Sequence, residues 1–205
     1  LKTAAVENGV SLRYETTVGA ALPILESIAR SVNSGDDIAR VDAVLSGTLN
    51  YIFSTYKGGE DGKTFADVVR QAQEAGYSEP DPRLDLSGRD VLRKLLILSR
   101  EAGAAIDEAD VEIDPILGPE FFSGKVPAFY EMLAANESSF AASYRAAADK
   151  GLRQRFVASL VAVQEEGGVH YKASMGLQCV GPENPLFNLC GTDNAALIKT
   201  SFYPS

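Results

Sequence analysis

Residues 76–94, with the sequence GYSEPDPRLDLSGRDVLRK, hold the side chains best suited to chemistry. A loop with two prolines carries three carboxylates and leads directly into an apolar helical pattern that contains one lysine, Lys94. Asp90 precedes Lys94 by four residues, so the two side chains lie on one helix face, with the acid on the favourable N-terminal side. A lysine held by an acid beside a buried surface is a candidate proton donor, because burial and neighbouring charges set its pKa.

The three carboxylates of the loop belong to Glu79, Asp81 and Asp85. Two free acids at this place suit the ammonium group of a small substrate, and the prolines favour a preorganised loop. A solvated acidic turn is the alternative, since Pro-Asp-Pro sequences often form exposed turns. Asp90 and Lys94 have a similar alternative, an ordinary surface ion pair that contributes about 0.3–0.5 kcal/mol.

The composition is that of an ordinary globular protein and argues against several classes of partner. Of the 205 residues, 45% are hydrophobic and 23% are charged, which is enough apolar material for one large domain. The formal net charge of −9 argues against a nucleic acid or an anionic membrane as partner, since both require clustered lysine and arginine. No apolar run approaches the roughly 20 residues that span a bilayer. The first ten residues show no secretory signal pattern.

The cysteines and the histidine do not predict a metal centre. Cys179 and Cys190 lack metal-ligand spacing, and His170 is the single histidine of the chain. We expect both cysteines to be reduced, buried thiols. His170 lies in a strand-like stretch, and we interpret it as an incidental strand residue, which leaves little basis for Ser-His-Asp or Cys-His catalysis.

The hydrophobic spacing predicts helices early in the chain and strands late. Helical patterns cover residues 2–8, 22–33, 46–56, 64–76, 88–102 and 128–150, the last with a break near 136–138. Strand patterns cover residues 38–45, a short piece near 111, 152–164, 169–179 and 193–203, with a further β-rich stretch at 11–17.

These patterns show no regular alternation of strand and helix. We therefore predict an α+β fold, with a mixed, mainly antiparallel sheet and helices packed on one face. Thr64 and Asp67 resemble a capping box at one helix start. Asp85 or Ser87 is the expected N-cap of the helix at 88–102.

Four motifs make the chain resemble the catalytic and dimerisation region of homoserine dehydrogenases. They are YETTVGAALPI (14–24), SGTLNYI (46–52), GYSEPDPRLDLSGRDVLRKLLIL (76–98) and NPLFNLCGTDNAALIKT (184–200). They follow one another in the family's order along nearly the whole chain, and the third is highly specific.

The resemblance implies an NAD(P)-dependent interconversion of L-aspartate 4-semialdehyde and L-homoserine, in the biosynthesis of threonine, methionine and isoleucine. In the family, the lysine that matches Lys94 is the acid/base group, and the aspartate that matches Asp90 lies beside it. The residues that match Glu79 and Asp85 bind substrate. The resemblance adds three further candidates for the substrate site, which are Gly47, Thr48 and Tyr77, although a helix cap and simple packing remain open for them.

The YETTVGAAL stretch resembles the family's loop for a monovalent cation, and the resemblance implies sodium as that ion. The oxygens there come from the residues that match Glu15, Val18, Ala20 and Leu22, mostly from backbone carbonyls. Hard oxygen ligands suit such an ion. A tight turn with no ion is the alternative that the residues themselves allow.

No G-x-G-x-x-G motif follows a strand in this chain, so the resemblance implies that NAD or NADP is bound mainly by residues outside it. We expect residues 1–10 to be the tail of an upstream dinucleotide-binding domain and residues 11–205 to be the catalytic and dimerisation domain. In the family a C-terminal return segment follows, which is missing here, and an aspartate kinase is fused in some members.

The resemblance also implies a homodimer, located in the cytoplasm, or in a plastid if the source is a plant or alga. Two other interpretations remain open at this point. One is a dimerisation module without catalysis, in which edges of the late strand pair join two subunits. The other is a dehydrogenase for a different small semialdehyde.

Overall fold

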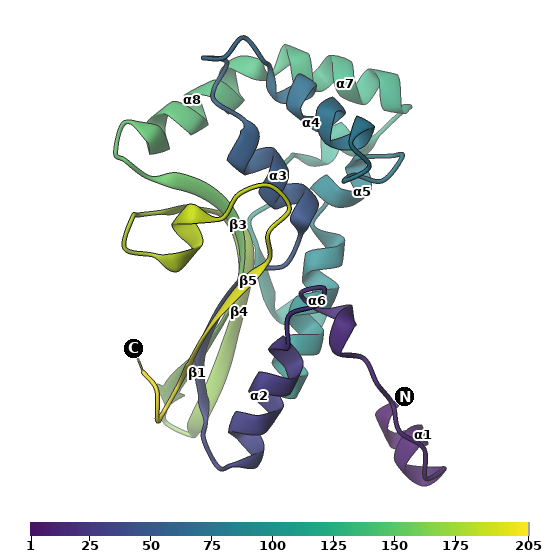
Figure 1. The fold of residues 1–205 in the computed structure, drawn as a ribbon, viewed down its shortest axis with the longest axis vertical. Coiled ribbons are helices and arrows are strands. Elements are labelled where there is room, and N and C mark those ends of the chain that lie inside the picture. The colour runs from purple at the N-terminus through teal and green to yellow at the C-terminus, as the bar shows by residue number, and fades with distance from the viewer. Residues whose placement is uncertain (205) are drawn as a thin grey trace.

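A five-stranded sheet forms the spine of the molecule in the computed structural model, which describes residues 1–204 (Figure 1). The spatial order of the strands is β2-β4-β3-β1-β5. The pairs β1–β3, β1–β5 and β3–β4 are antiparallel, and β2 pairs with β4 in parallel. The strands are β1 (Ile38–Val44), β2 (Val111–Ile113), β3 (Arg153–Glu165), β4 (Gly168–Val180) and β5 (Ala195–Thr200).

Eight α-helices accompany the sheet within residues 1–204, and none of them is long and apolar enough to cross a membrane. Figure 1 shows α2 and α6 along one face of the sheet, with α3, α4, α7 and α8 gathered at one end. The helices are α1 (Lys2–Glu7), α2 (Ile24–Asn33), α3 (Gly47–Thr55), α4 (Phe65–Glu74), α5 (Arg83–Leu86), α6 (Arg89–Glu101), α7 (Val126–Ala135) and α8 (Glu137–Ala148). Short 3-10 turns are η1 (Glu15–Thr17), η2 (Glu108–Asp110), η3 (Pro119–Phe122) and η4 (Pro185–Asn188). This arrangement confirms the predicted α+β fold.

The β3–β4 hairpin organises the sheet. Both strands have 13 residues and pair along their whole length, from Arg153 opposite Val180 to Glu165 opposite Gly168. The other side of β3 pairs with β1 in its middle, at residues 158–161.

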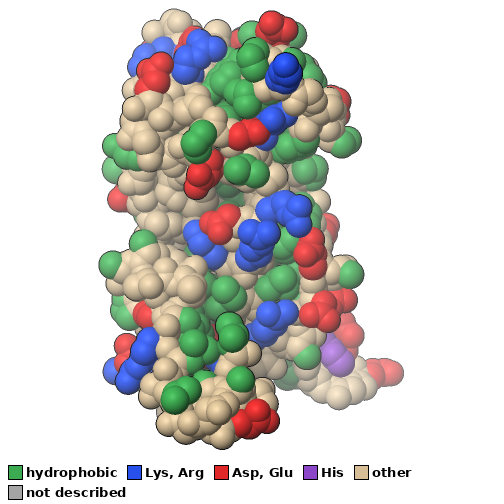
Figure 2. Space-filling model, turned by 90° about the vertical axis from the view of Figure 1, so that its right-hand side faces the viewer, with side chains coloured by type: hydrophobic (Ala, Val, Ile, Leu, Met, Phe, Trp, Pro, Cys, Tyr) green, Lys and Arg blue, Asp and Glu red, His purple; other side chains and the backbone are tan. Residues whose placement is uncertain are grey.

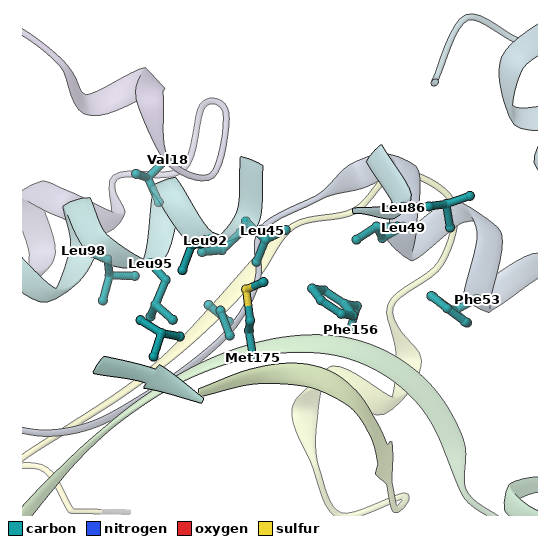
Figure 3. Close-up of a cluster of buried hydrophobic side chains, with 14 of the residues drawn as sticks. Val18, Leu45, Leu49, Phe53, Leu86, Leu92, Leu95, Leu98, Phe156 and Met175 are labelled. Atoms are coloured by element: carbon teal, nitrogen blue, oxygen red, sulfur yellow. The ribbon is translucent and has the colours of Figure 1, made fainter. Parts of the chain in front are cut away.

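Helix α6 buries its apolar side against the sheet (Figure 3). Leu92, Leu95 and Leu98 recur at a spacing of three, which keeps them on one side of the helix, and each is at least 96% buried. They meet Met175 of β4 and other buried side chains in one continuous core. This packing fixes the rotation of α6 and therefore the direction in which Lys94 points.

The helix starts confirm one expected cap and correct another. Thr64 and Asp67 form the expected capping box at α4. At α6 the N-cap is Gly88, with a left-handed φ of +70°, and neither Asp85 nor Ser87 fills that position. A Cβ at Gly88 would lie 3.2 Å from atoms of Phe156 and Met175, so the close approach to the sheet favours glycine.

Three smaller expectations were wrong. The β-rich stretch at 11–17 pairs with no strand in the described chain and ends in η1. Strand β5 ends at Thr200 because the chain turns back there, with the Thr200 N–H donating to the Tyr203 carbonyl at 3.0 Å. Cys179 and Cys190 are free thiols, as expected, but both are exposed: β2 pairs with β4 only at 173–175, short of Cys179, and Cys190 lies in a surface loop.

Candidate active site

Lys94 lies in the middle of α6 and points toward the residue that follows β1. Its ammonium donates to the carbonyl oxygen of Leu45 at 2.9 Å and forms an ion pair with the Asp90 carboxylate at 2.7 Å. The Lys94 side chain is 22% exposed, whereas that of Asp90 is 63% exposed. Asp90 also lies in the first turn of α6, where the helix dipole favours a negative charge. The expected pairing of Asp90 with Lys94 is present, and a backbone carbonyl completes it.

The contacts of Lys94 leave room for a ligand. An ammonium group has three N–H donors, and the described residues occupy two of them. The Leu45 carbonyl belongs to the short connection between β1 and α3, which places the ammonium beside the start of α3. A small molecule bound at that junction can therefore accept the remaining N–H of Lys94.

Asp85 shapes the acidic loop from within. Its Oδ2 accepts hydrogen bonds from the Ser78 hydroxyl at 2.9 Å and from the Glu79 backbone N–H at 3.0 Å. The carboxylate of Glu79 itself is exposed, and no hydrogen bond or ion pair to it is found within residues 1–204. The loop thus holds one acid as a structural clamp and presents another acid outward.

Asp81 is committed to a different contact. Its carboxylate accepts hydrogen bonds from Nε of Arg83 at 2.8 Å and from Nη2 at 2.6 Å. Nη1 of Arg83 donates to the Gly124 carbonyl at 2.9 Å. The Arg83 guanidinium lowers the pKa of Asp81 below its ordinary value. Asp81 therefore anchors the loop to the segment before α7, which leaves Glu79 as the acid without a protein partner.

Helix α3 begins at Gly47, directly beside the acidic loop. Ser46 caps it, with its hydroxyl accepting the Leu49 N–H at 3.2 Å. The Thr48 hydroxyl donates to the carbonyl of Tyr77, and the Tyr77 ring lies 5.0 Å from that of Tyr51 between centroids. Tyr77 remains 46% exposed. Three of the candidates, Gly47, Thr48 and Tyr77, are thus brought together.

Lys94, the start of α3 and the acidic loop are connected through backbone groups rather than through direct contacts between their charged side chains. Lys94 bonds to Leu45, two residues before Gly47, and Thr48 bonds to Tyr77, two residues before Glu79. No hydrogen bond or ion pair joins Lys94 to Glu79 or Asp85 within the described residues. Figure 2, which views the side of the molecule that faces right in Figure 1, shows basic side chains gathered at mid-height among acidic ones.

The loop at residues 190–194 belongs to the same junction, although the sequence analysis assigned it no role. Asn50, which is 1% exposed, donates to the carbonyls of Cys190 at 3.3 Å and Gly191 at 3.1 Å. A Cβ at Gly47 would lie 2.9 Å from the carbonyl oxygen of Thr192, so glycine is required there. The turn-forming sequence CGTDN was the available signal for this loop.

Two buried amide oxygens near this junction have no partner within residues 1–204: Oδ1 of Asn50 and Oδ1 of Asn194. Asn194 also lines a hollow of about 310 Å³ between the start of α2 and the start of β5. Since Ala195 pairs with Val44, this hollow lies next to the strand end that leads to Leu45. Unpaired buried acceptors beside an open hollow are typical of a site that a ligand or water completes.

The expected cation loop holds its acid by hydrogen bonds. The two carboxylate oxygens of Glu15 accept the backbone N–H groups of Leu25 and Glu26, each at 2.8 Å. Pro23 is the N-cap residue of α2, and its side chain cannot accept a hydrogen bond. The Glu15 carboxylate therefore caps the N-terminus of α2 in its place. Glu15 therefore stabilises the start of α2.

The backbone of this loop is turned so that carbonyls remain available. Ala20 has a left-handed φ of +54°, the only such non-glycine residue in the described chain. Within residues 1–204 the carbonyls of Val18 and Ala20 accept no backbone N–H, whereas that of Leu22 accepts the Ile24 N–H at 2.9 Å. Free carbonyls beside a carboxylate fit a hard cation chemically.

A family model described as homoserine dehydrogenase matches residues 23–205 of the chain. The chain is 38% identical over 198 residues to the bifunctional aspartokinase/homoserine dehydrogenase 2, chloroplastic, of Zea mays, covering 93% of the chain and 20% of the maize protein. It is 35% identical over 210 residues to the homoserine dehydrogenase of Emericella nidulans, covering 98% of the chain and 55% of that protein.

A solved structure shows the same fold. The homoserine dehydrogenase of Thiobacillus denitrificans superposes with a TM-score of 0.72 at 25% identity, over 98% of this chain and 41% of that one. The chain thus spans about a fifth of the length of the maize relative and about half of the fungal one.

The role of Asp85 as a clamp predicts a local effect on the loop. Replacing Asp85 with alanine should remove the acceptor for the Glu79 N–H and destabilise the protein by about 1–2 kcal/mol. Hydrogen exchange should then show faster exchange of the Glu79 amide. Asp85→Asn is the matched control, because its amide oxygen can still accept. Unchanged exchange in the alanine variant would show that Asp85 does not hold the loop.

Proposed function

The chain belongs to the homoserine dehydrogenase family, and we propose on this basis that it provides the substrate site and the acid/base lysine for the interconversion of L-homoserine and L-aspartate 4-semialdehyde. The observation that carries this proposal is the setting of Lys94. Its ammonium is held between Asp90 and the Leu45 carbonyl, with one N–H directed to neither, beside the start of α3. The pathway is then the biosynthesis of threonine, methionine and isoleucine.

The proposed proton transfer follows from the charge that forms on the substrate. Reduction of an aldehyde places negative charge on its oxygen, and a neighbouring ammonium both stabilises that charge and donates a proton. In the opposite direction the same nitrogen, once deprotonated, accepts the proton of the homoserine hydroxyl. Asp90 and Leu45 keep the Lys94 nitrogen in place during both reduction and oxidation. Each of them accepts one N–H of Lys94, and the third position on the nitrogen faces the substrate.

The remaining candidates match the two charged ends of the amino-acid substrate. We assign the substrate ammonium to the outward carboxylate of Glu79, in the loop that Asp85 clamps. We assign the substrate carboxylate to the backbone N–H groups of Gly47 and Thr48 at the N-terminus of α3, where the helix dipole favours an anion. We assign the exposed Tyr77 ring, which packs beside Tyr51 of α3, to the wall of the same site.

NAD(P), when bound, supplies or takes up the hydride. The chain has no glycine-rich strand-to-helix turn of the dinucleotide-binding type, so we assign cofactor binding mainly to other parts of the full-length protein. We assign residues 1–10 to that neighbouring domain and residues 11–205 to the catalytic and dimerisation domain. In support, α1 has no buried residue, and Lys2 joins it to the rest of the chain through an ion pair with Glu101 at the end of α6.

We further propose that the loop of residues 15–22 binds a monovalent cation, with sodium as the ion. The ligands would be the carboxylate of Glu15 and the carbonyls of Val18, Ala20 and Leu22. Two of these carbonyls are free of backbone N–H donors within residues 1–204, and oxygen donors of this type suit sodium. Such an ion would brace the turn that leads into α2.

A homodimer is part of the same proposal, and the sheet face turned away from α2 and α6 is its most suitable surface. Alternation along β3 places Leu160 in the core and the half-buried Val161 and Val163 on the opposite face. We place the enzyme in the cytoplasm, or in a plastid if the source is a plant or alga, since the maize relative is named chloroplastic.

Removal of the Lys94 ammonium should abolish most of the activity. In the full-length enzyme, Lys94→Ala should lower kcat by about 10²–10⁴-fold, the usual contribution of a general acid. Stability should change by about 1 kcal/mol, the usual net contribution of a hydrogen bond such as that from Lys94 to the Leu45 carbonyl. Arg93→Ala is the matched control, since Arg93 is the exposed neighbour on the same helix. Turnover of Lys94→Ala close to that of Arg93→Ala would rule out the assignment.

The cation proposal predicts a sodium-dependent stability. In enzyme dialysed against tetramethylammonium chloride, exchange into sodium chloride of equal concentration should raise Tm by a few degrees, because the ion binds only the folded loop. Glu15→Gln should lose most of this increase. Glu26→Gln, which changes an exposed acid paired with Arg30, should keep it. Equal increases in the two variants would contradict a site at Glu15.

The dimer proposal predicts that a charge on the outer sheet face separates the subunits. Val161→Glu should sediment at half the mass of the unmodified protein, because burying an unpaired carboxylate in an interface costs several kcal/mol. Val169→Glu is the control, since Val169 is 57% exposed near the tip of the hairpin. A persistent dimer in Val161→Glu would place the interface elsewhere.

A further inference from the structure

A second cavity lies away from Lys94, at the opposite end of α3. It has a volume of about 420 Å³ and is enclosed by the last turns of α3 and α8, the first residues of β3 and the loop around η4. These elements lie around the upper left part of Figure 1. The volume falls in the range of small-molecule sites. None of the candidate residues of the active site lines this cavity.

The charges of the cavity are of one sign. Its lining contains three basic side chains, Lys57, Arg153 and Arg155, and no aspartate or glutamate, although the whole chain has a net charge of −9. The carboxylates of Glu60 and Asp61 lie close enough to influence the Tyr144 hydroxyl, but they belong to the exposed loop beyond the lining. The cavity is therefore a local basic site in an acidic protein.

Arg155 is the most unusual of the three. It is 2% exposed, and the guanidinium donates only to backbone carbonyls, those of Gln154, Leu186, Phe187 and Leu189, at 2.7–3.1 Å. No carboxylate pairs with it within residues 1–204. Nη1 carries two N–H groups, and one of them has no partner in the described chain. A buried cation without an anionic partner is costly, and a bound anion would offset that cost.

Besides the polar side chains of Ser54, Gln154 and Tyr144, most of the remaining lining is apolar or aromatic. Phe53, Leu152, Phe187 and Leu189 form walls that can accept a hydrocarbon or aromatic body. Arg153 stacks on the Phe187 ring, with its guanidinium carbon 4.1 Å from the ring centroid, which holds a positive charge at the wall. A ligand that fits this cavity thus combines one negative group with an apolar body.

We propose that this cavity binds a small organic monocarboxylate, with the carboxylate facing Lys57, Arg153 and Arg155 and an aromatic or aliphatic body against Phe53 and Leu152. The carboxylate accepts the open N–H of Arg155, and the planar guanidinium of Arg153 offers further donors in a suitable geometry. This site is independent of the proposed catalytic activity, since it uses none of the same side chains.

Calorimetric titration of the full-length protein with 3-phenylpropionate tests the proposal, and 3-phenylpropionamide is the uncharged ligand of the same shape. We expect saturable binding of one carboxylate per chain and an affinity about tenfold or more weaker for the amide, because the amide loses the charge-assisted bonds. The Lys57→Glu variant should bind 3-phenylpropionate with an affinity about tenfold or more weaker than that of the unmodified protein. Lys57 is exposed and its ammonium bonds only to the Ser54 carbonyl, so this variant should fold.

Lys63→Glu provides the matched control, because it makes the same change of charge at an exposed lysine outside the lining. It should bind 3-phenylpropionate like the unmodified protein. Three results would overturn the proposal: equal affinity for the acid and the amide, equal affinity of Lys57→Glu and Lys63→Glu for the acid, or no saturable binding up to about 10 mM, where even a weak specific site would begin to fill.

Discussion

The hydrogen bond from the Lys94 ammonium to the Leu45 carbonyl connects the two halves of the candidate site. On one side of it stands α6, whose direction is fixed by the burial of Leu92, Leu95 and Leu98. On the other side stands the end of β1, which is held in the sheet by β3 and β5. The lysine is therefore positioned by the hydrophobic core on one side and by the sheet ladder on the other, and neither depends on a flexible loop.

The rest of the site is built outward from the connection between β1 and α3. Gly47 allows the 190–194 loop to approach within contact distance. The buried Asn50 side chain donates hydrogen bonds to two backbone carbonyls of that loop. Thr48 extends the connection to Tyr77 and so to the acidic loop. Glycine and short polar side chains prevail here because several backbone segments meet where a larger side chain would have no space.

Local patterns were sufficient to predict most of the architecture. The helical pattern at residues 88–102, the strand pattern at 152–164 and the capping box at Thr64 each depend on neighbours in sequence, and all three are confirmed. The ion pair between Asp90 and Lys94 belongs to the same class, because residues four apart on a helix must lie close together.

The features that sequence reasoning missed depend on distant contacts. Asp85 was a plausible helix cap, but its carboxylate turns back to Ser78 and Glu79, and the close approach of the sheet selects glycine at the cap position. Glu15 bonds to N–H groups ten and eleven residues later in the chain, which no local pattern indicates. The exposure of Cys179 likewise depends on how far β2 extends along β4.

Helix α3 has a different chemical setting at each end: the candidate substrate site lies at its start and the basic cavity at its end. It has nine residues and is therefore only about 13 Å long. The loop from η4 to β5 contacts both settings, since the Leu189 carbonyl accepts a hydrogen bond from Arg155 of β3, the Cys190 carbonyl accepts one from Asn50, and Thr192 lies against Gly47. A ligand beside Arg155 would therefore lie next to the same loop that packs against the substrate end of α3. One loop thus fixes the geometry of both ends: its carbonyls hold the guanidinium at the cavity, and its close approach requires glycine at the first position of α3.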